Sequence, residues 1–231
     1  CALPIFFAIV IVKQFFGGLG NNFVNPALSA RIFLVIAFPA QMTLWTVRES
    51  TSSLMSSLRG ADLVTSATPL SILRDATIHH GNIPLAEYKD NLPSLLSLFM
   101  GDQGGCIGEI SAFALLIGAA YLFLRKVISP SIPLAYLGSF TLFVLFFGYN
   151  PIYRTLADAS FSVSTIQQIA YEPLYMLFSG GLILGAFFMA TDYVTSPLTT
   201  RGRIIFGIGC GVLTFLIRYY ANISGGVSFA I

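Results

Sequence analysis

Apolar residues in this sequence gather into blocks of about 16 to 19 residues, and this clustering constrains the fold more than any other feature. A hydrocarbon core of about 30 Å is crossed by roughly 20 helical residues, so each block approaches the length of one transmembrane helix. Charged residues make up 10% of the chain, and a soluble surface of this size needs more. The sequence therefore predicts an all-α, polytopic transmembrane helix bundle that forms one membrane domain over residues 1–231.

The apolar blocks predict six spans and the start of a seventh, joined by one long polar loop (48–105), a smaller one (150–172) and short turns. Several blocks are short, so tilted spans and re-entrant segments remain as alternatives to simple crossings. The chain opens inside an apolar run and closes on residues typical of a helix start, so we expect a fragment of a longer protein. The expected spans are Cys1–Phe16, Ala30–Val47, Cys106–Leu124, Pro133–Tyr149, Pro173–Ala190 and Arg203–Tyr220, with the seventh from Gly225.

The distribution of basic residues predicts which side of the membrane each loop faces. Short loops that are rich in Lys and Arg face the cytoplasm. Six basic residues lie in or beside the short loops and six in or beside the long ones, so the higher density in the short loops decides. We therefore expect the loop over 48–105 to be extracytoplasmic. The short-loop set is Lys13, Arg31, Arg125, Lys126, Arg201 and Arg203, and the long-loop set is Arg48, Arg59, Arg74, Lys89, Arg154 and Arg218.

Two turn segments repeat one pattern. The pairs Gly118-Ala119 and Gly185-Ala186 are each followed, at equal spacing, by a valine and then by Ser-Pro. A related run, 24–31, places Asn-Pro before a further span. Proline is favoured at the first helical position, so each such proline is expected to start a helix. Duplicated helix pairs explain the echo, and so does the frequent use of Ser-Pro and Asn-Pro at helix starts.

Two acids, Glu109 and Asp192, lie in or beside apolar blocks. Ionisable groups at that depth are costly, so each is a candidate for an ion path, or alternatively an interfacial charge at a helix end. Asp158 and Glu172 are expected to be solvated loop residues. Neither His79-His80 nor the three separated cysteines have metal-site spacing, so no metal site is expected on this chain alone. No basic run predicts nucleic-acid binding.

The segment Asp62-Leu63-Val64-Thr65-Ser66-Ala67-Thr68 is the most informative stretch. Taken alone, it is a turn before a short helix, with Thr68 as the cap. It also resembles the flavinylation signal D-x-x-[S/T]-[G/A/S]-A-T, in which the phosphate of FMN esterifies the last threonine. Ser66 stands where glycine or alanine is more usual.

Further segments resemble the same family. These are K-Q-F-F-G-G-L-G from Lys13, G-E-I-S-A from Gly108 and G-A-F-F-M-A-T-D from Gly185, although Tyr193 stands where proline is expected. Together they resemble the D-subunit family of the Rnf complexes, which are ion-translocating ferredoxin:NAD oxidoreductases. The B subunit of the sodium-pumping NADH:quinone reductase is a related family.

The resemblance implies a membrane electron carrier of a bacterial or archaeal cell. It implies covalent FMN on Thr68, facing outward, with Asp62, Thr65, Ser66 and Ala67 as the attachment signal. It further implies non-covalent riboflavin nearer the cytoplasm, other Rnf subunits as partners within the lipid membrane, and export of Na⁺ or H⁺.

The turn after the first span offers candidates for the second flavin. Asparagine amides can pair with the polar edge of a flavin ring, and glycines permit close approach of the ring. An ordinary turn with asparagine caps explains the same residues. Arg59 and Arg74 can neutralise the FMN phosphate, or they are solvated loop charges. The candidates are Asn22 and Asn25, with Gly17, Gly18 and Gly20.

Three hypotheses compete with the flavin-carrying Rnf subunit. One is a cofactor-free, channel-like permease built from repeated helix pairs, and another is a structural scaffold for partner subunits. A third is the flavin subunit of the sodium-pumping quinone reductase. Composition and repeats support the permease as well as they support the electron carrier, so the motif ending at Thr68 and the family resemblance separate them.

Overall fold

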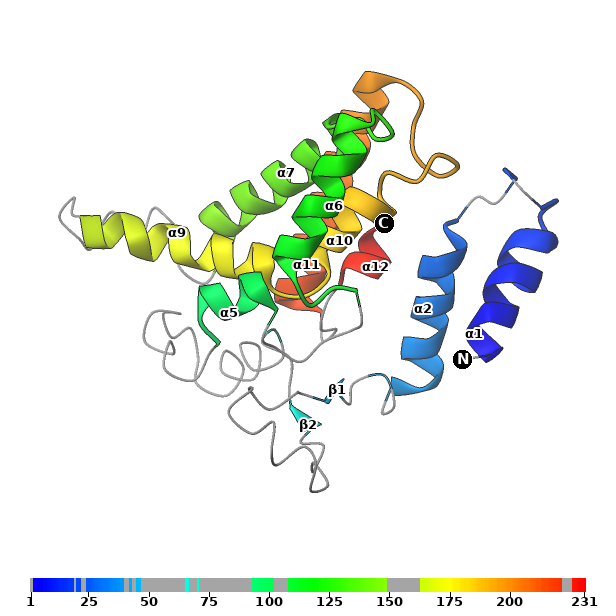
Figure 1. The fold of residues 1–231 in the computed structure, drawn as a ribbon, viewed down its shortest axis with the longest axis horizontal. Helices are drawn as coiled ribbons and strands as arrows, with labels where there is room; N and C mark the ends of the chain where they lie inside the picture. Colours follow the sequence, from blue (N-terminus) through cyan, green and yellow to red (C-terminus); the bar gives the residue numbers. More distant parts are fainter. Residues whose placement is uncertain are drawn as a thin grey trace.

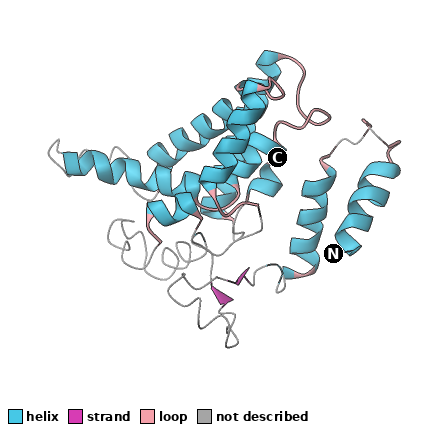
Figure 2. Cartoon of the chain, viewed as in Figure 1, coloured by secondary structure: helices cyan, strands magenta, loops and turns pink. Residues whose placement is uncertain are grey.

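The structure is a computed structural model, and it describes residues 2–18, 20–21, 24–39, 42, 45–46, 65–66, 70, 93–101, 108–148, 163–221 and 226–231. This part of the chain is almost wholly helical (Figure 2). Its two strands, β1 (Trp45–Thr46) and β2 (Thr65–Ser66), form one short antiparallel pair. The expected helical class is thus confirmed for the described residues.

One described helix, Thr200–Tyr220, is long and apolar enough to cross a membrane by itself. A second crossing is formed if the bent pair Ile169–Phe178 and Leu182–Met189 counts as one span. The other apolar helices in the described part of the chain are shorter than 18 residues. The number of six to seven spans therefore stays a prediction.

An N-terminal hairpin lies beside the main bundle (Figure 1). Helix α1 (Ala2–Phe6) continues as the π-helix η1 (Phe7–Gln14), and α2 (Pro26–Ala37) packs back against it. The rings of Phe7 and Phe33 stack between the two, with centroids 4.4 Å apart.

The second span begins earlier and ends earlier than expected. Asn25 caps α2, because its Oδ1 accepts from the backbone N–H of Ala27 at 3.0 Å, and Pro26 takes the first helical position. The helix ends at Ala37 because Pro39 restricts the residue before it, and Phe38 leaves the helical region at φ −135° and ψ 57°. The predicted bounds Ala30–Val47 are therefore wrong.

The core of the bundle is the contact between α7 (Ser131–Phe147) and α11 (Thr200–Tyr220). Small residues let the two backbones approach: a Cβ on Gly207 would lie 2.8 Å from the carbonyl oxygen of Ile132. The Tyr136 hydroxyl hydrogen-bonds Thr214 Oγ1 at 2.6 Å, one helical turn or more further along both helices. The helices therefore run in the same direction, packed through small residues as membrane helices often are.

A second pair of helices runs alongside. Helix α6 (Ala112–Leu124) contacts the segment formed by α10 (Leu182–Leu184) and the π-helix η5 (Gly185–Met189). The Phe123 and Phe187 rings meet edge to face at 5.8 Å. Cys210, in α11, is buried in the core.

The predicted span Pro173–Ala190 is not one helix. Helix α9 (Val163–Phe178) starts ten residues before Pro173 and carries this proline inside it. The helix is then interrupted, and the chain bends by 69° before the next helix begins at Leu182. The predicted loop 150–172 therefore contains the first turns of α9, and the long loop 48–105 contains α5 (Leu95–Met100), whose Phe99 packs on Phe178.

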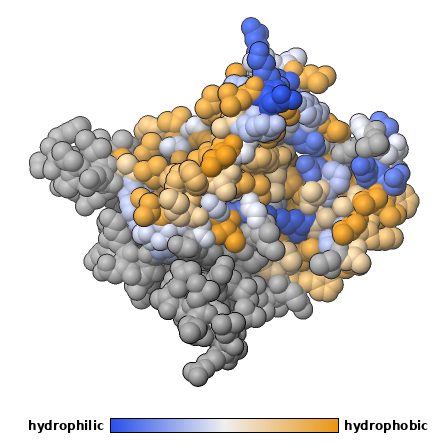
Figure 3. Space-filling model, in the orientation of Figure 1, coloured by the Kyte–Doolittle hydropathy of each residue, from blue (hydrophilic) through white to orange (hydrophobic). Residues whose placement is uncertain are grey.

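The outer faces of the helices are apolar, as a lipid environment requires. Leu134, Phe147 and Ile205 are among the large hydrophobic side chains that are mostly exposed. Figure 3 shows hydrophobic residues over much of the helical surface, with hydrophilic ones at the end where α11 begins and at the turn of the N-terminal hairpin.

The two turns that share the repeated valine and Ser-Pro pattern, 127–130 and 194–197, lie against each other at that end. Arg203 donates to the Pro197 carbonyl at 3.0 Å and to Ser129 Oγ at 3.2 Å, and the Tyr193 hydroxyl reaches the carbonyl of Val127. Of the three prolines expected to start helices, only Pro26 is the first helical residue. Pro130 is the N-cap of α7, and Pro197 precedes Thr199, the N-cap of α11. Duplication of helix pairs stays a prediction.

The glycine contact predicts a large difference between two substitutions in one helix. A Cβ on Gly211 would collide with Ser139, whereas Gly209 has nothing within 4 Å. Gly211→Val should therefore destabilise the protein by about 1–3 kcal/mol through overpacking, and Gly209→Val should not. Thermal unfolding of the detergent-purified protein, followed by size-exclusion chromatography, measures both. Equal melting temperatures would contradict this packing.

Candidate functional site

The helix is interrupted between α9 and α10, at Ser179-Gly180-Gly181. Gly180 has a φ of +67°, a backbone conformation that favours glycine. A break exposes the last carbonyl groups of the helix before it. No water is available to satisfy them within hydrocarbon, so broken helices are tolerated where the protein itself supplies partners.

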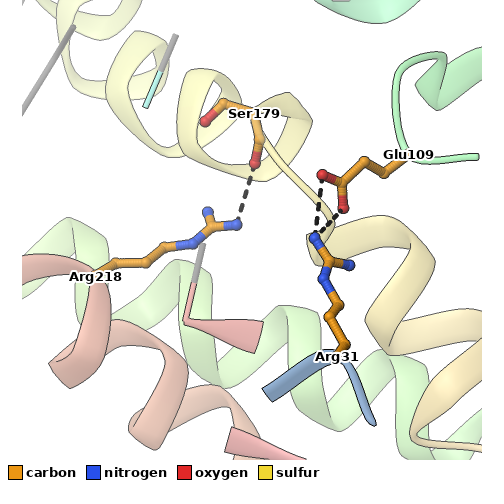
Figure 4. A network of polar contacts seen from close by, with 4 residues as sticks. All are labelled: Arg31, Glu109, Ser179 and Arg218. Atoms are coloured by element: carbon orange, nitrogen blue, oxygen red, sulfur yellow. Dashed lines mark hydrogen bonds and ion pairs between the residues drawn. The ribbon is translucent and has the colours of Figure 1, made fainter. Parts of the chain in front are cut away.

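Arg218, in α11, supplies hydrogen-bond donors for these carbonyl groups. Its guanidinium donates to the Met176 carbonyl at 2.6 Å. It also donates to the Ser179 carbonyl at 3.1 Å (Figure 4). The side chain is buried, with 6% exposed, and its charge lies over the Phe140 ring at 5.3 Å. A cation at a helix C-terminus also interacts favourably with the helix dipole. Arg218 therefore stabilises the broken end of α9.

Glu109 lies on the other side of the break, just before α6. Arg31 of α2 donates through Nη2 to both carboxylate oxygens of Glu109, at 3.2 and 3.4 Å (Figure 4). A Cβ on Gly181 would collide with this carboxylate, and a Cβ on Gly180 would lie 3.4 Å from Arg218 Nη2. The two adjacent glycines thus separate a carboxylate from a buried guanidinium.

The positions of Arg31 and Arg218 change the basis of the charge count. Both were counted at loop edges, but both lie inside helices and have polar partners within the protein. Arg203 also lies inside α11 and donates to Pro197 and Ser129, so the short-loop set loses two of its six residues and the long-loop set loses one, which leaves four and five. The two numbers remain close, and the outward side of the long loop stays a prediction.

Two further candidates, Asn25 and Asp192, are brought together although they are 167 positions apart. Asn25 Nδ2 donates to Asp192 Oδ2 at 3.4 Å, and Thr195 Oγ1 donates to the same oxygen at 3.4 Å. Asn25 Oδ1 is used by the α2 cap. Both ends of this amide are therefore engaged, as the cap interpretation expected.

The glycine turn before Asn25 has an open backbone. Gly17, Gly18 and Gly20 have φ values of 108°, 87° and 86°, so each relies on the freedom of glycine. Gly20 is exposed and has nothing within 4 Å of a hypothetical Cβ. Asn22 lies outside the described residues.

Within the flavinylation motif, the structure describes only Thr65 and Ser66. Thr65 and Ser66 form β2, which pairs with Trp45 and Thr46. Leu70 is buried in the core, and a Cβ on Gly180 would lie 4.0 Å from its Cδ2. Leu70, two residues after the motif, thus packs against the helix break. The other predicted residues of this region are outside the described part of the chain: Asp62, Ala67, Thr68, Arg59, Arg74, His79 and His80.

Sequence reasoning misplaced Glu172 as a solvated loop residue. It lies within α9 with 1% of its surface exposed, and its Oε1 accepts from the Tyr219 hydroxyl at 2.7 Å. Tyr171 and Tyr175, four residues apart, continue the helical spacing through Pro173 and are the signal that was available. Asp158 is not among the described residues.

Buried charges around a broken apolar helix are typical of membrane proteins that move ions or electrons. The chain belongs to the NQR2, RnfD, RnfE family, which matches it over residues 1–231.

Individual relatives match nearly all of the chain. The D subunit of a Na⁺-translocating ferredoxin:NAD⁺ oxidoreductase complex from Acetobacterium woodii is 44% identical over 97% of this chain and 58% of its own length. The D subunit of a proton-translocating ferredoxin:NAD⁺ oxidoreductase complex from Clostridium ljungdahlii is 37% identical over 100% and 62%. The D subunit of an ion-translocating oxidoreductase complex from Stutzerimonas stutzeri is 39% identical over 97% and 62%. The chain thus spans 58–62% of the length of these relatives.

Removing the Arg218 guanidinium should destabilise the protein strongly. Arg218→Met leaves the Met176 and Ser179 carbonyls without these bonds, at about 1–3 kcal/mol for each unsatisfied buried group. Arg201→Met removes a cation from the same helix at an exposed position and should have little effect. Melting temperatures in detergent test the difference. If Arg218→Met has the same melting temperature as the wild type, the bend does not depend on these hydrogen bonds.

Proposed function

We propose that this chain is the membrane electron-carrier part of the D subunit of an ion-translocating ferredoxin:NAD⁺ oxidoreductase complex. The carrying observation is the run Asp62 to Thr68, which has the form of a flavinylation signal in a chain of this family. The names of the relatives support this assignment, since they describe the D subunits of such complexes. Its partners are then the other subunits of the complex, within the cell membrane of a bacterium or an archaeon.

In this proposal the Thr68 hydroxyl holds FMN through a phosphate ester. Asp62, Thr65, Ser66 and Ala67 form the attachment signal, in which the small residues leave room for the phosphate. FMN supplies the redox chemistry, while the chain positions it and excludes water. Leu70 contributes to this positioning, because two residues of chain reach at most about 7 Å and Leu70 is anchored in the core.

The turn that contains Asn22 and Asn25 is proposed to hold the second flavin, riboflavin. Gly20 gives a flat ring access to the backbone. Asn25 already caps α2 and binds Asp192, so it meets a ring edge only if the bond to Asp192 opens. Asn22 and the backbone N–H groups of the turn are therefore the better candidates for the polar edge of the ring.

Glu109 and Asp192 are proposed to lie on the path of the coupling ion. Each faces α2 and has a partner there, Arg31 for Glu109 and Asn25 for Asp192. The relatives are named for translocation of Na⁺ in one case and of protons in another, so either ion suits a carboxylate path. We place the loop that bears Thr68 on the extracytoplasmic side, from the density of basic residues in the short loops.

The broken helix also favours a second function, that of a cofactor-free, channel-like permease. Many transporters form their substrate sites at discontinuous helices. The two functions differ in one observable, because only the electron carrier holds a covalent flavin. A bound flavin also separates the electron carrier from a structural scaffold.

The flavin assignment predicts a fluorescent protein band. The full-length protein, expressed in cells that transfer FMN and denatured on a gel, should fluoresce under ultraviolet light, and Thr68→Ala should abolish the band. Thr77→Ala removes a threonine of the same loop outside the motif and should leave it unchanged. Mass spectrometry of the peptide around Thr68 should show the added mass of FMN. A dark wild-type band would favour the permease or the scaffold.

A further inference from the structure

Two arginines meet the helix break, and their contacts differ in kind. Arg218 is 6% exposed and donates through two nitrogens to two carbonyl oxygens. Arg31 has 30% of its side chain exposed and reaches Glu109 through one nitrogen, at 3.2 and 3.4 Å. Strong guanidinium–carboxylate pairs use two nitrogens at about 2.7–2.9 Å. The pair between Arg31 and Glu109 is therefore much easier to exchange than the contacts of Arg218.

Glu109 nevertheless requires a positive charge. Its carboxylate is 11% exposed beside an apolar helix, where an uncompensated charge is costly. The described charges around it are Arg31 from α2 and Arg218 from α11, and the latter is engaged with the end of α9. Of the two arginines, Arg31 is thus the cation that can leave the carboxylate at the lower cost.

We propose that Arg31 is a tethered counter-cation that holds Glu109 between transport events and is displaced by the coupling ion. This rests on the proposed function, in which Glu109 lies on the ion path. When a monovalent cation or a proton arrives, it neutralises the carboxylate and the guanidinium moves away. When the ion leaves, Arg31 returns, so the carboxylate is never left with an unpaired charge.

The exchange also affects the position of α2. This helix is tied to the bundle by Arg31 with Glu109 and by Asn25 with Asp192, and it contacts α12 (Val227–Ala230). Displacement of Arg31 opens one of these two polar ties. Helix α2 should therefore be held less firmly when the ion is bound than when it is absent.

The test uses the whole complex in liposomes, with electron transfer from ferredoxin to NAD⁺ measured against Na⁺ concentration. Arg31→Gln removes the competitor, so the half-saturating Na⁺ concentration should fall about fivefold. Arg31→Lys keeps a tethered cation and should stay within about twofold of the wild type. Arg125→Gln, an exposed cation elsewhere, should change nothing. An unchanged or higher half-saturating concentration in Arg31→Gln would overturn the proposal.

Glu109→Gln separates this inference from the proposed function. If Glu109 is on the path, this variant loses its ion dependence, and adding Arg31→Gln to it has no further effect. If Glu109→Gln keeps the wild-type ion dependence, the ion-path assignment fails. If Glu109→Gln loses it while Arg31→Gln behaves as the wild type, only the role of Arg31 fails. When the complex responds to protons and not to Na⁺, the pH of half-maximal rate replaces the Na⁺ concentration and should move upward in Arg31→Gln.

A measurement on the wild-type complex covers the case in which Arg31→Gln does not assemble. Hydrogen exchange of the peptide over 26–37 should be faster at saturating Na⁺ than without Na⁺, because the tie to Glu109 opens. The peptide over 131–147, in the tightly packed α7, serves as the control and should not change. Equal exchange of the α2 peptide in the two conditions, in a complex whose rate depends on Na⁺, would overturn the proposal.

Discussion

The two hydrogen bonds from Arg218 to the end of α9 join three parts of this fold. They satisfy carbonyl groups that a lipid environment cannot satisfy, and so they permit α9 to stop and α10 to start in a new direction. Arg218 can make these bonds because α11 is held close to α7 at Gly207 and Gly211. The close packing of α7 and α11 thus supports the irregular segment beside them, which Glu109 faces from the start of α6.

The sequence predicts the regular helices well and the irregular site poorly. Apolar length finds α7 and α11 to within about three residues, because a straight span needs a continuous apolar block. The same criterion fails for α2, whose start is set by the cap Asn25-Pro26, and for α9, which continues through Pro173. It takes Glu172 for a loop residue because polarity alone does not report burial.

The site shows the same division. The candidates Glu109, Asp192 and Asn25 come from the sequence, because an acid in an apolar block and a cap before a helix are local patterns. Their partners do not, since Arg31 and Glu109 are 78 positions apart and meet only through the arrangement of α2 and α6. Arg31 and Arg218 look like ordinary helix-end charges until the break between α9 and α10 is known. The motif that ends at Thr68 stays a prediction from the sequence alone.

Leu70, two residues after the predicted attachment residue Thr68, reaches the irregular centre of the bundle. Its side chain belongs to the buried core and packs beside Gly180, the residue about which the backbone changes course. A rotation of α10 about Gly180 therefore also moves the residues against which Leu70 packs. The apolar contact of Leu70 with Gly180 therefore couples the position of this side chain to the direction in which α10 leaves the bend.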